Sequence, residues 1–390
     1  MPNIESSPFP LVFRVPEHVV ELSVDDPSAL SLRTYVRVLE GMQKEALVAL
    51  ATPSGRHIWR MVSDEGPYLQ GTDLAPFPLA FFTAGMQFSL LSELLRHAEA
   101  NGVSIQRLSL SQDNYYTMEG SALQATMIGG AKPPEVTIKV EADSPAEIIA
   151  HLIRLAQQSS PAHALMRDVL SNAFALTFND RALNVTDLNP SAESFTDDVG
   201  AVFDNARPDN SAEFRDAIIT RVSQARQLFG VEGGAASSLQ AEQKRTLHVH
   251  GGANWLGGRL LETTIQLYRP IGSTFRFVCD ETRATGGQES APPPLAYLAA
   301  GIGFCYMTQI GRYAHITKQK LNAYRIIQDN TFIVGETARA LPLDTHVFLE
   351  ADEPDEVARK TVWMSERTCF LHAAMRGSYP SAIQVELNGG

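Results

Sequence analysis

The residues of this chain with the most reactive side chains are its three cysteines, Cys279, Cys305 and Cys369. Three cysteines are too few for a disulfide framework, so we expect reduced thiols in a cytoplasmic compartment. Cys305 lies in the apolar run "APPPLAYLAAGIGFCYM", which begins at Ala291. A lone cysteine in such a run is most often a small buried hydrophobe. A chemical role for Cys305 therefore needs a second observation.

That second observation is an internal repeat. The run "APFPLAFFTAGMQFSLL" from Ala75 agrees with the cysteine-containing run at 8 of 17 positions, and Ser89 stands where Cys305 would be. A second match joins "ADSPAEIIAHLIRLAQQSSPAHALMRD" to "ADEPDEVARKTVWMSERTCFLHAAMRG", and here Ser160 stands in place of Cys369. Paired loss is what a two-cysteine device would show if one copy had lost its function. Cys279 also has a serine counterpart, Ser63, so the pairing is suggestive only.

The two matches occur in the same order, which predicts a duplicated chain. We expect one domain over residues 1–190 without the cysteine pair and one over residues 246–390 with it. The segment 191–245 is expected to be a linker, with one helix over "AEFRDAIITRVSQARQLF". Apolar periodicity and turn residues predict the order βββ–α–ββ–αα–β in each copy, with a long helix from about residue 295 to residue 314. This is an α+β fold of antiparallel sheets packed on long central helices.

The pattern "PPLAYLAAGIGFC", with a second cysteine 64 residues later, resembles the OsmC/Ohr family of thiol peroxidases. The preceding "GGANWLGGRLLETTIQLY" resembles the N-terminal strands of that family. The resemblance covers the second copy almost end to end and the first copy more weakly. Members of this family form intertwined homodimers, so the resemblance implies two tandem OsmC-like domains that form an intramolecular pseudo-dimer.

The resemblance also implies a chemistry. Cys305 would attack the O–O bond of an organic hydroperoxide and become a sulfenic acid, and Cys369 would resolve it as a disulfide. An external dithiol would then reduce the protein. Arg259 matches the arginine that activates the thiol in this family.

Two positions depart from the family pattern. The family usually has a glutamate ten residues before the first cysteine, where this chain has Leu295. The family's second cysteine is usually followed by proline, where this chain has Phe370. The missing glutamate puts the strength of any peroxidase activity in doubt.

Other functions are open at this stage. A cysteine-dependent hydrolase or acyl-transfer enzyme would use Cys305 as nucleophile and His250 or His372 as base. A non-catalytic protein could instead hold a small ligand in a cleft between the domains. His248 and His250 share one face of a strand, but no further ligand at metal spacing accompanies them, so we expect no metal and no cofactor.

The aromatic residues near the repeat suggest an apolar substrate. If Phe88, Tyr297, Phe304 and Tyr306 reach the cleft, the substrate is bulky and apolar. The formal net charge of −12 argues against a nucleic-acid partner. We identify neither a signal peptide nor an apolar run of about 20 residues, so we expect no membrane attachment. Further association into a homodimer is left open.

Overall fold

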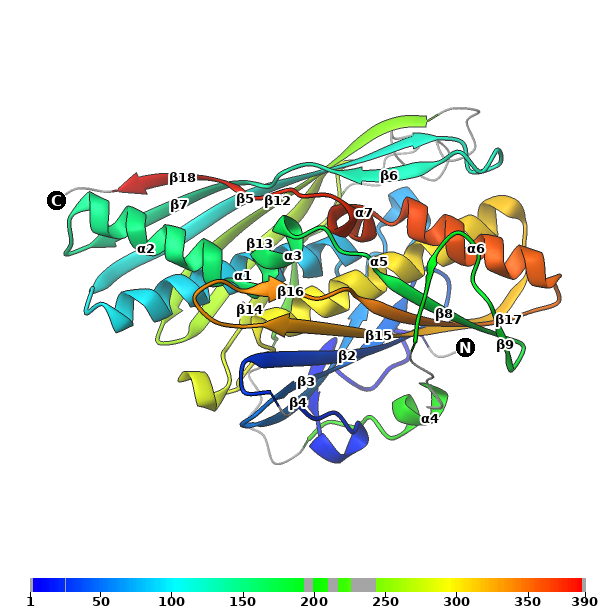
Figure 1. Cartoon of the computed structure of the whole chain (residues 1–390), viewed down its shortest axis with the longest axis horizontal. Helices are drawn as coiled ribbons and strands as arrows, with labels where there is room; N and C mark the ends of the chain where they lie inside the picture. Colours follow the sequence, from blue (N-terminus) through cyan, green and yellow to red (C-terminus); the bar gives the residue numbers. More distant parts are fainter. Residues whose placement is uncertain (1–2, 25, 193–198, 210–216, 226–242, 388–390) are drawn as a thin grey trace.

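The structure is a computed structural model that describes residues 3–24, 26–192, 199–209, 217–225 and 243–387. It is a mixed α+β fold with two sheets and two long helices between them (Figure 1). The first part of the chain contains β1 (Val12–Val15), β2 (Ala29–Val38), β3 (Lys44–Thr52), β4 (Gly55–Ser63), α1 (Pro78–Ala100), β5 (Ile105–Gly120), β6 (Ile128–Ala131), β7 (Glu135–Ala142), α2 (Ala146–Ser159), α3 (Pro161–Arg167), β8 (Ala173–Phe178), β9 (Arg181–Leu183) and β10 (Asn189–Pro190).

The second part repeats the same order of elements. It contains β12 (Gln243–Gly257), β13 (Leu260–Arg269), β14 (Thr274–Cys279), α5 (Pro294–Thr317), β15 (Leu321–Ile333), β16 (Arg339–Ala340), β17 (Asp344–Ala351), α6 (Asp355–Thr368), α7 (Phe370–Arg376) and β18 (Ala382–Leu387). The expected α+β order of strands and helices is therefore present in this part of the chain.

Each sheet combines strands from both parts of the chain. One sheet runs β1-β4-β3-β2-β15-β17-β8-β10. The other runs β11-β14-β13-β12-β5-β7-β18, where β11 is the short strand Ile219–Ser223. The join is antiparallel in both, through β2 with β15 and through β12 with β5. The two sequence halves are therefore interwoven, and strands of one half lie beside helices of the other. The duplication and its domain boundaries stay a prediction, but the two sheets follow the same order of corresponding strands.

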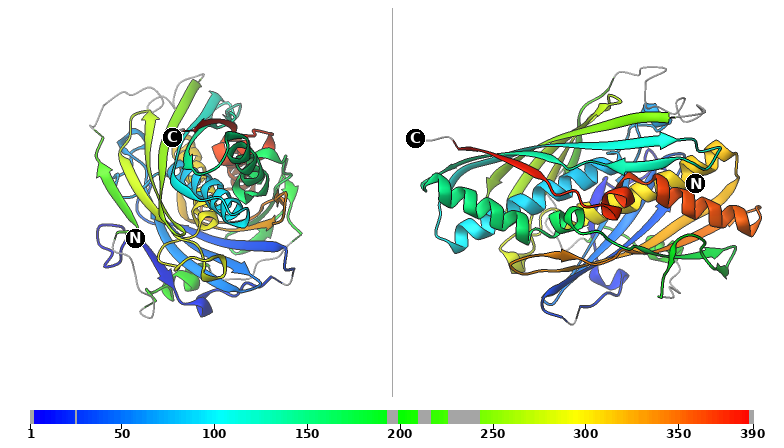
Figure 2. Two further views of the ribbon diagram at one scale, coloured as in Figure 1. Left: turned by 90° about the vertical axis from the view of Figure 1, so that its left-hand side faces the viewer. Right: turned by 45° about the horizontal axis from the view of Figure 1, so that its top comes forward.

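The helices α1 and α5 pack against each other between the sheets (Figure 2). Glycine permits this close contact. A Cβ atom on Gly85 would lie 2.6 Å from the backbone nitrogen of Leu298, and one on Gly301 would lie 2.6 Å from that of Phe82. The two glycines are 216 residues apart and make the same contact from opposite sides. The sequence "LAAGIG" therefore marks a helix approached closely by another backbone.

The segment between the two parts differs from the sequence prediction. Within the helix expected over residues 212–229, the described residues Ile219–Ser223 form strand β11, which pairs with β14. The β-branched residues of this strand favour an extended chain, and pairing buries Ile219 against the sheet. The rest of that expected helix lies outside the described residues, apart from positions 217–218 and 224–225. The segment instead contains α4 (Val199–Asp204), in a stretch that the sequence had indicated as loop.

Helix α1 also corrects an expectation about membranes. By length and hydropathy it could cross a bilayer, which the composition of the run had not suggested. In the structure 89% of its apolar stretch is buried inside the protein, as in the core helix of a globular domain.

Candidate active site

Cys305 and Cys369 meet in the protein core. Their Sγ atoms are 3.4 Å apart, and both side chains are buried. Cys305 comes from the middle of α5, and Cys369 is the residue between α6 and α7. A disulfide needs an S–S distance of about 2.05 Å, so a small movement would join the two sulfurs. The third thiol, Cys279, is buried at the end of β14, and burial raises its pKa well above the usual value.

The serines of the first copy occupy the corresponding place. The hydroxyls of Ser89 and Ser160 are 2.8 Å apart and hydrogen-bonded, and both are buried. The backbone around the second residue is nearly the same in both copies, with φ −71° and ψ 116° at Ser160 and φ −71° and ψ 120° at Cys369. The fold therefore builds two equivalent polar pairs, and only one of them contains sulfur.

Burial opposes ionisation of Cys369. It raises the pKa of this thiol, and the contact with Cys305 raises it further. The backbone N–H groups of Leu371 and His372, in the first turn of α7, favour the thiolate and partly offset both effects. The net effect of these surroundings is to raise the pKa of Cys369 well above its usual value.

A buried lysine from the other half of the chain lies near Cys305. Lys44 begins strand β3, is 1% exposed, and donates a hydrogen bond of 2.6 Å to the carbonyl of Met42. Burial lowers the pKa of Lys44, while attraction to Glu65, Asp64 and Cys305 raises it. A thiolate at Cys305 and an ammonium at Lys44 therefore stabilise each other.

Glu65 and two partners complete this charged group. Its carboxylate accepts hydrogen bonds from Tyr68 at 2.9 Å and from Thr308 at 3.1 Å. Burial raises the pKa of Glu65, and the Lys44 ammonium opposes that effect. Arg312, one turn beyond Thr308 on α5, also interacts with Glu65 electrostatically. We call Lys44, Glu65, Tyr68, Thr308 and Arg312 the charged cluster.

Sequence reasoning missed this cluster. The one available signal was a charged pair, Lys44 and Glu45, at the start of the otherwise apolar "ALVALAT". Ser63 and Cys279 are counterparts in the repeat. Lys44 pairs with Ser63 in one sheet and Leu261 pairs with Cys279 in the other, so Leu261 occupies the position that corresponds to Lys44. The buried lysine is thus present on the thiol side and replaced by leucine on the serine side.

The described contacts of Arg259 are with acidic residues. Its guanidinium forms an ion pair with Glu99 at the end of α1 and interacts with Glu281, on the serine side of the molecule. A cation that does interact electrostatically with Cys305 is Lys44, from the first half of the chain.

Neither candidate base is placed to accept a proton from Cys305. The Nδ1 atom of His250, on β12, lies 2.9 Å from the carboxylate of Asp113, on β5. The same carboxylate is 2.6 Å from Nε2 of His248, also on β12. The ring of His372 is fully buried against Phe174 and Tyr306. Among the described residues neither of its nitrogens has a hydrogen-bond partner.

The burial of His372 leads to a prediction on acid stability. Burial lowers its pKa in the folded protein to about 3, whereas an unfolded histidine titrates near 6.5. As the pH falls below ~6.5, the unfolded state takes up a proton that the folded state refuses, so stability is lost. Between pH 7.5 and pH 5 this costs ~2 kcal/mol. We expect His372→Leu to remove that loss, as measured by urea unfolding at both pH values. His151→Leu, at an exposed position, is the control, and an equal pH response in both variants would contradict the assignment.

The aromatic residues expected to line a substrate pocket lie in the core instead. Phe88, Tyr297, Phe304 and Tyr306 are all fully buried. They pack on other rings, as in the pairs Phe88–Tyr297 at 5.8 Å and Phe81–Phe304 at 5.2 Å between ring centroids. None of the four lines the cavities described below, because the close contact of α1 with α5 fills the space between the helices.

A small cavity of about 30 Å³ reaches Cys305 itself. Three aromatic side chains, Tyr68, Phe77 and Phe370, contribute to its wall, with Glu65 and Thr308 at its polar side. This volume is about the share of one water molecule. Within the residues that the structure describes, no group of three histidine, cysteine or acidic side chains is arranged to hold a metal ion.

Comparison with known proteins agrees with the thiol site. Residues 286–384 match the family model described as OsmC-like protein. A solved structure that matches is that of an OsmC-like hydroperoxide resistance protein from Jannaschia sp. CCS1, with 22% sequence identity, a TM-score of 0.20, and coverage of 32% of this chain and 83% of the other. No curated protein matches the chain. The matched segment includes Cys305, Cys369 and the helices that carry them, and so this part of the chain, residues 286–384, is similar to the OsmC-like family.

Proposed function

We propose that the protein is a thiol-dependent peroxidase that reduces hydroperoxides. The Cys305 thiolate attacks one oxygen of ROOH, the O–O bond breaks, and ROH leaves with a proton from the site. The resulting sulfenic acid reacts with the Cys369 thiol to give a disulfide and water. An external dithiol then reduces the disulfide and is itself oxidised to a disulfide.

The observation that carries this proposal is the 3.4 Å approach of the two sulfurs. A buried cysteine with a packing role alone does not need a second cysteine within reach of disulfide formation. The charged cluster gives further support, because a thiolate in an apolar helix needs a cation nearby. The hydrolase alternative has no such support, since neither His250 nor His372 is arranged as a base for Cys305.

The small cavity bears on the choice of substrate. With about 30 Å³ beside Cys305, the cavity has more nearly the size of hydrogen peroxide than of an organic hydroperoxide. A bulky organic hydroperoxide requires Tyr68, Phe77 or Phe370 to rotate away. We infer that the rate of Cys305 oxidation falls as the size of the hydroperoxide grows.

Disulfide mapping tests the proposed reaction. The reduced protein is treated with one equivalent of hydrogen peroxide or cumene hydroperoxide, alkylated, digested and analysed by mass spectrometry. We expect a Cys305–Cys369 disulfide in near-stoichiometric yield, with Cys279 alkylated as a free thiol. Cys279→Ser should behave as the unchanged protein. Recovery of free Cys305 and Cys369 after treatment with either peroxide would contradict the proposal.

The reductant and the compartment follow from the same proposal. All three cysteines are free thiols in the structure. A site of this kind turns over only where a dithiol donor is present, so we propose a cytoplasmic location and a dithiol protein or small dithiol as partner.

A further inference from the structure

A cavity of about 610 Å³ opens beside Ser89, in the half of the molecule that lacks the cysteine pair. This volume is within the range of small-molecule sites in proteins. The cavity takes its walls from strands, helices and loops of both sequence halves. Its lining residues are Pro27, Ser28, Leu30, Leu50, Thr52, Ser89, Ser92, Glu93, Arg96, Ser159, Pro161, Glu281, Thr282, Thr285, Pro293, Pro294, Leu295, Val334 and Gly335. We call it the serine-side cavity.

The serine-side cavity and the small cavity at Cys305 are built from corresponding positions. Ser89, Ser92 and Glu281 of the first correspond to Cys305, Thr308 and Glu65 of the second, at the repeat offset of 216. Strand register extends the match, because Leu32 pairs with Leu50 in one sheet as Val249 pairs with Leu267 in the other. Leu50 and Leu267 line the two cavities at equivalent places.

Three exchanges of aromatic for smaller residues contribute to the difference in volume. Tyr68, Phe77 and Phe370 line the small cavity. The repeat offsets of 216 and 209 align them with Ala284, Pro293 and Pro161. Each exchange removes a ring from the wall of the serine-side cavity. The cavity beside Ser89 therefore has no cysteine in its wall and a large volume, whereas the cavity beside Cys305 has a thiol and a small volume.

The walls of the serine-side cavity indicate the chemistry of a ligand. Leucine, proline and valine side chains supply most of the surface, which suits an apolar body. The charged groups are already paired, since Arg96 bonds Glu93, and Glu93 accepts a further hydrogen bond of 2.5 Å from Ser159. Burial raises the pKa of Glu281, whereas its hydrogen bonds with Ser92 and Thr285 lower it.

Arg96 is thus already paired with Glu93, and the carboxyl group of Glu281 is bonded to two hydroxyls. A carboxylate ligand would meet Glu93 and Glu281, and an ammonium ligand would compete with Arg96. The hydroxyls of Ser28, Ser89 and Thr282 already bond Asp26, Ser160 and Thr285, and each keeps a lone pair that can accept a hydrogen bond from a neutral polar group.

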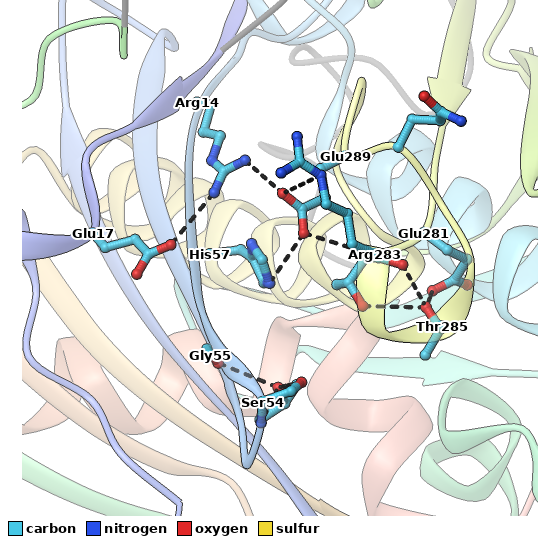
Figure 3. A network of polar contacts seen from close by, with 12 residues as sticks. Arg14, Glu17, Ser54, Gly55, His57, Glu281, Arg283, Thr285 and Glu289 are labelled. Atoms are coloured by element: carbon cyan, nitrogen blue, oxygen red, sulfur yellow. Dashed lines mark hydrogen bonds and ion pairs between the residues drawn. The ribbon is translucent and has the colours of Figure 1, made fainter. Parts of the chain in front are cut away.

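One wall is held in place by a network across the two halves of the chain (Figure 3). The carboxylate of Glu289 accepts a hydrogen bond of 2.8 Å from Arg14 on β1 and one of 3.1 Å from the backbone N–H of Arg283. His57 on β4 lies 3.8 Å from the same carboxylate. These contacts fix the loop that contributes Glu281, Thr282 and Thr285, so the cavity is formed before a ligand arrives.

We propose that the serine-side cavity binds a neutral amphiphile, a molecule with an apolar body of about eight carbons and a single hydroxyl or carbonyl group. The polar group bonds the hydroxyls around Ser89, and the apolar body lies against Leu30, Leu50 and Leu295. Binding is non-covalent and does not use Cys305. The site is thus distinct from the proposed peroxidase centre.

Calorimetric titration of the full chain with 1-octanol, octanoate and octylamine at pH 7.5 tests the proposal. We expect one 1-octanol per chain, bound about tenfold or more tightly than either charged analogue. Pro161→Phe places in the cavity the ring that the other half has at the same helix position, and should weaken binding at least tenfold. Gly335→Trp is a second filling variant, because a Cβ atom there meets no atom within 4 Å.

Two controls separate this proposal from folding defects and from the peroxidase. Gly252→Trp adds the same ring outside the cavity, at a site where a Cβ atom also meets nothing within 4 Å, and should bind as the unchanged protein. Cys305→Ser should also keep binding, whatever its effect on peroxide reduction. Failure of the unchanged protein to bind 1-octanol overturns the proposal. So does tighter binding of octanoate or octylamine, or full binding by both filling variants.

Discussion

Replacing Cys305 by serine is expected to lower the turnover of hydroperoxide by about 1000-fold or more, because a hydroxyl at this place ionises far less readily and does not form a sulfenic acid. Cys369→Ser should instead keep the first step. The variant should consume about one equivalent of peroxide per chain and stop, since its sulfenic acid has no partner thiol. Peroxide consumption with excess dithiothreitol measures turnover, and a single-turnover experiment with a dimedone probe detects the sulfenic acid.

The proposed mechanism requires that Cys305→Ser loses the first step and that Cys369→Ser loses only the second. Serine at both positions already exists at Ser89 and Ser160, so both variants are expected to fold with their local geometry intact. Turnover in Cys305→Ser close to that of the unchanged protein would exclude the proposed mechanism. A sulfenic acid trapped on Cys279 in place of Cys305 would do the same.

Replacing Lys44 by methionine is the second large effect that we expect. Removing a cation near a developing thiolate in a poorly solvated site costs ~3 kcal/mol, which corresponds to a loss of roughly 100-fold in the rate of Cys305 oxidation. The loss should be smaller at pH 9 than at pH 7, because hydroxide then helps to form the thiolate. Stopped-flow measurement of Cys305 oxidation across this pH range gives the profile.

Matched variants show whether the charge of Lys44 is what matters. Lys44→Arg keeps a cation and should recover most of the rate. Arg259→Ala, which removes the arginine that faces Glu99, should leave the rate within about twofold. Leu261 shows that an apolar side chain is accommodated at the same position of the other sheet, so we expect Lys44→Met to fold. If Arg259→Ala lowers the rate of Cys305 oxidation more than Lys44→Met does, then Arg259 and not Lys44 activates the thiol.

Much of the secondary structure could be read from local sequence. The apolar run that contains Cys305 predicted a long buried helix, and α5 covers Pro294–Thr317. The strands around it follow from alternating side chains and turn residues, because these preferences act between near neighbours in the chain. The same local rules predicted a helix at Ile219–Ser223, which forms a strand because it pairs with β14.

The sequence by itself determined the two matched motifs, the exchange of Cys305 and Cys369 for Ser89 and Ser160, and hence which half of the chain contains the thiol site. Only the tertiary structure decided which cation lies close enough to interact with Cys305. Lys44 and Cys305 are far apart in the chain, and they come together because β2 pairs with β15 and β5 with β12, so that the strands of one half pack on the helix of the other. The same interweaving carries Arg259 to the serine side and leaves the cavity beside Ser89. Contacts of this kind depend on how distant segments pair, which no local pattern of side chains encodes.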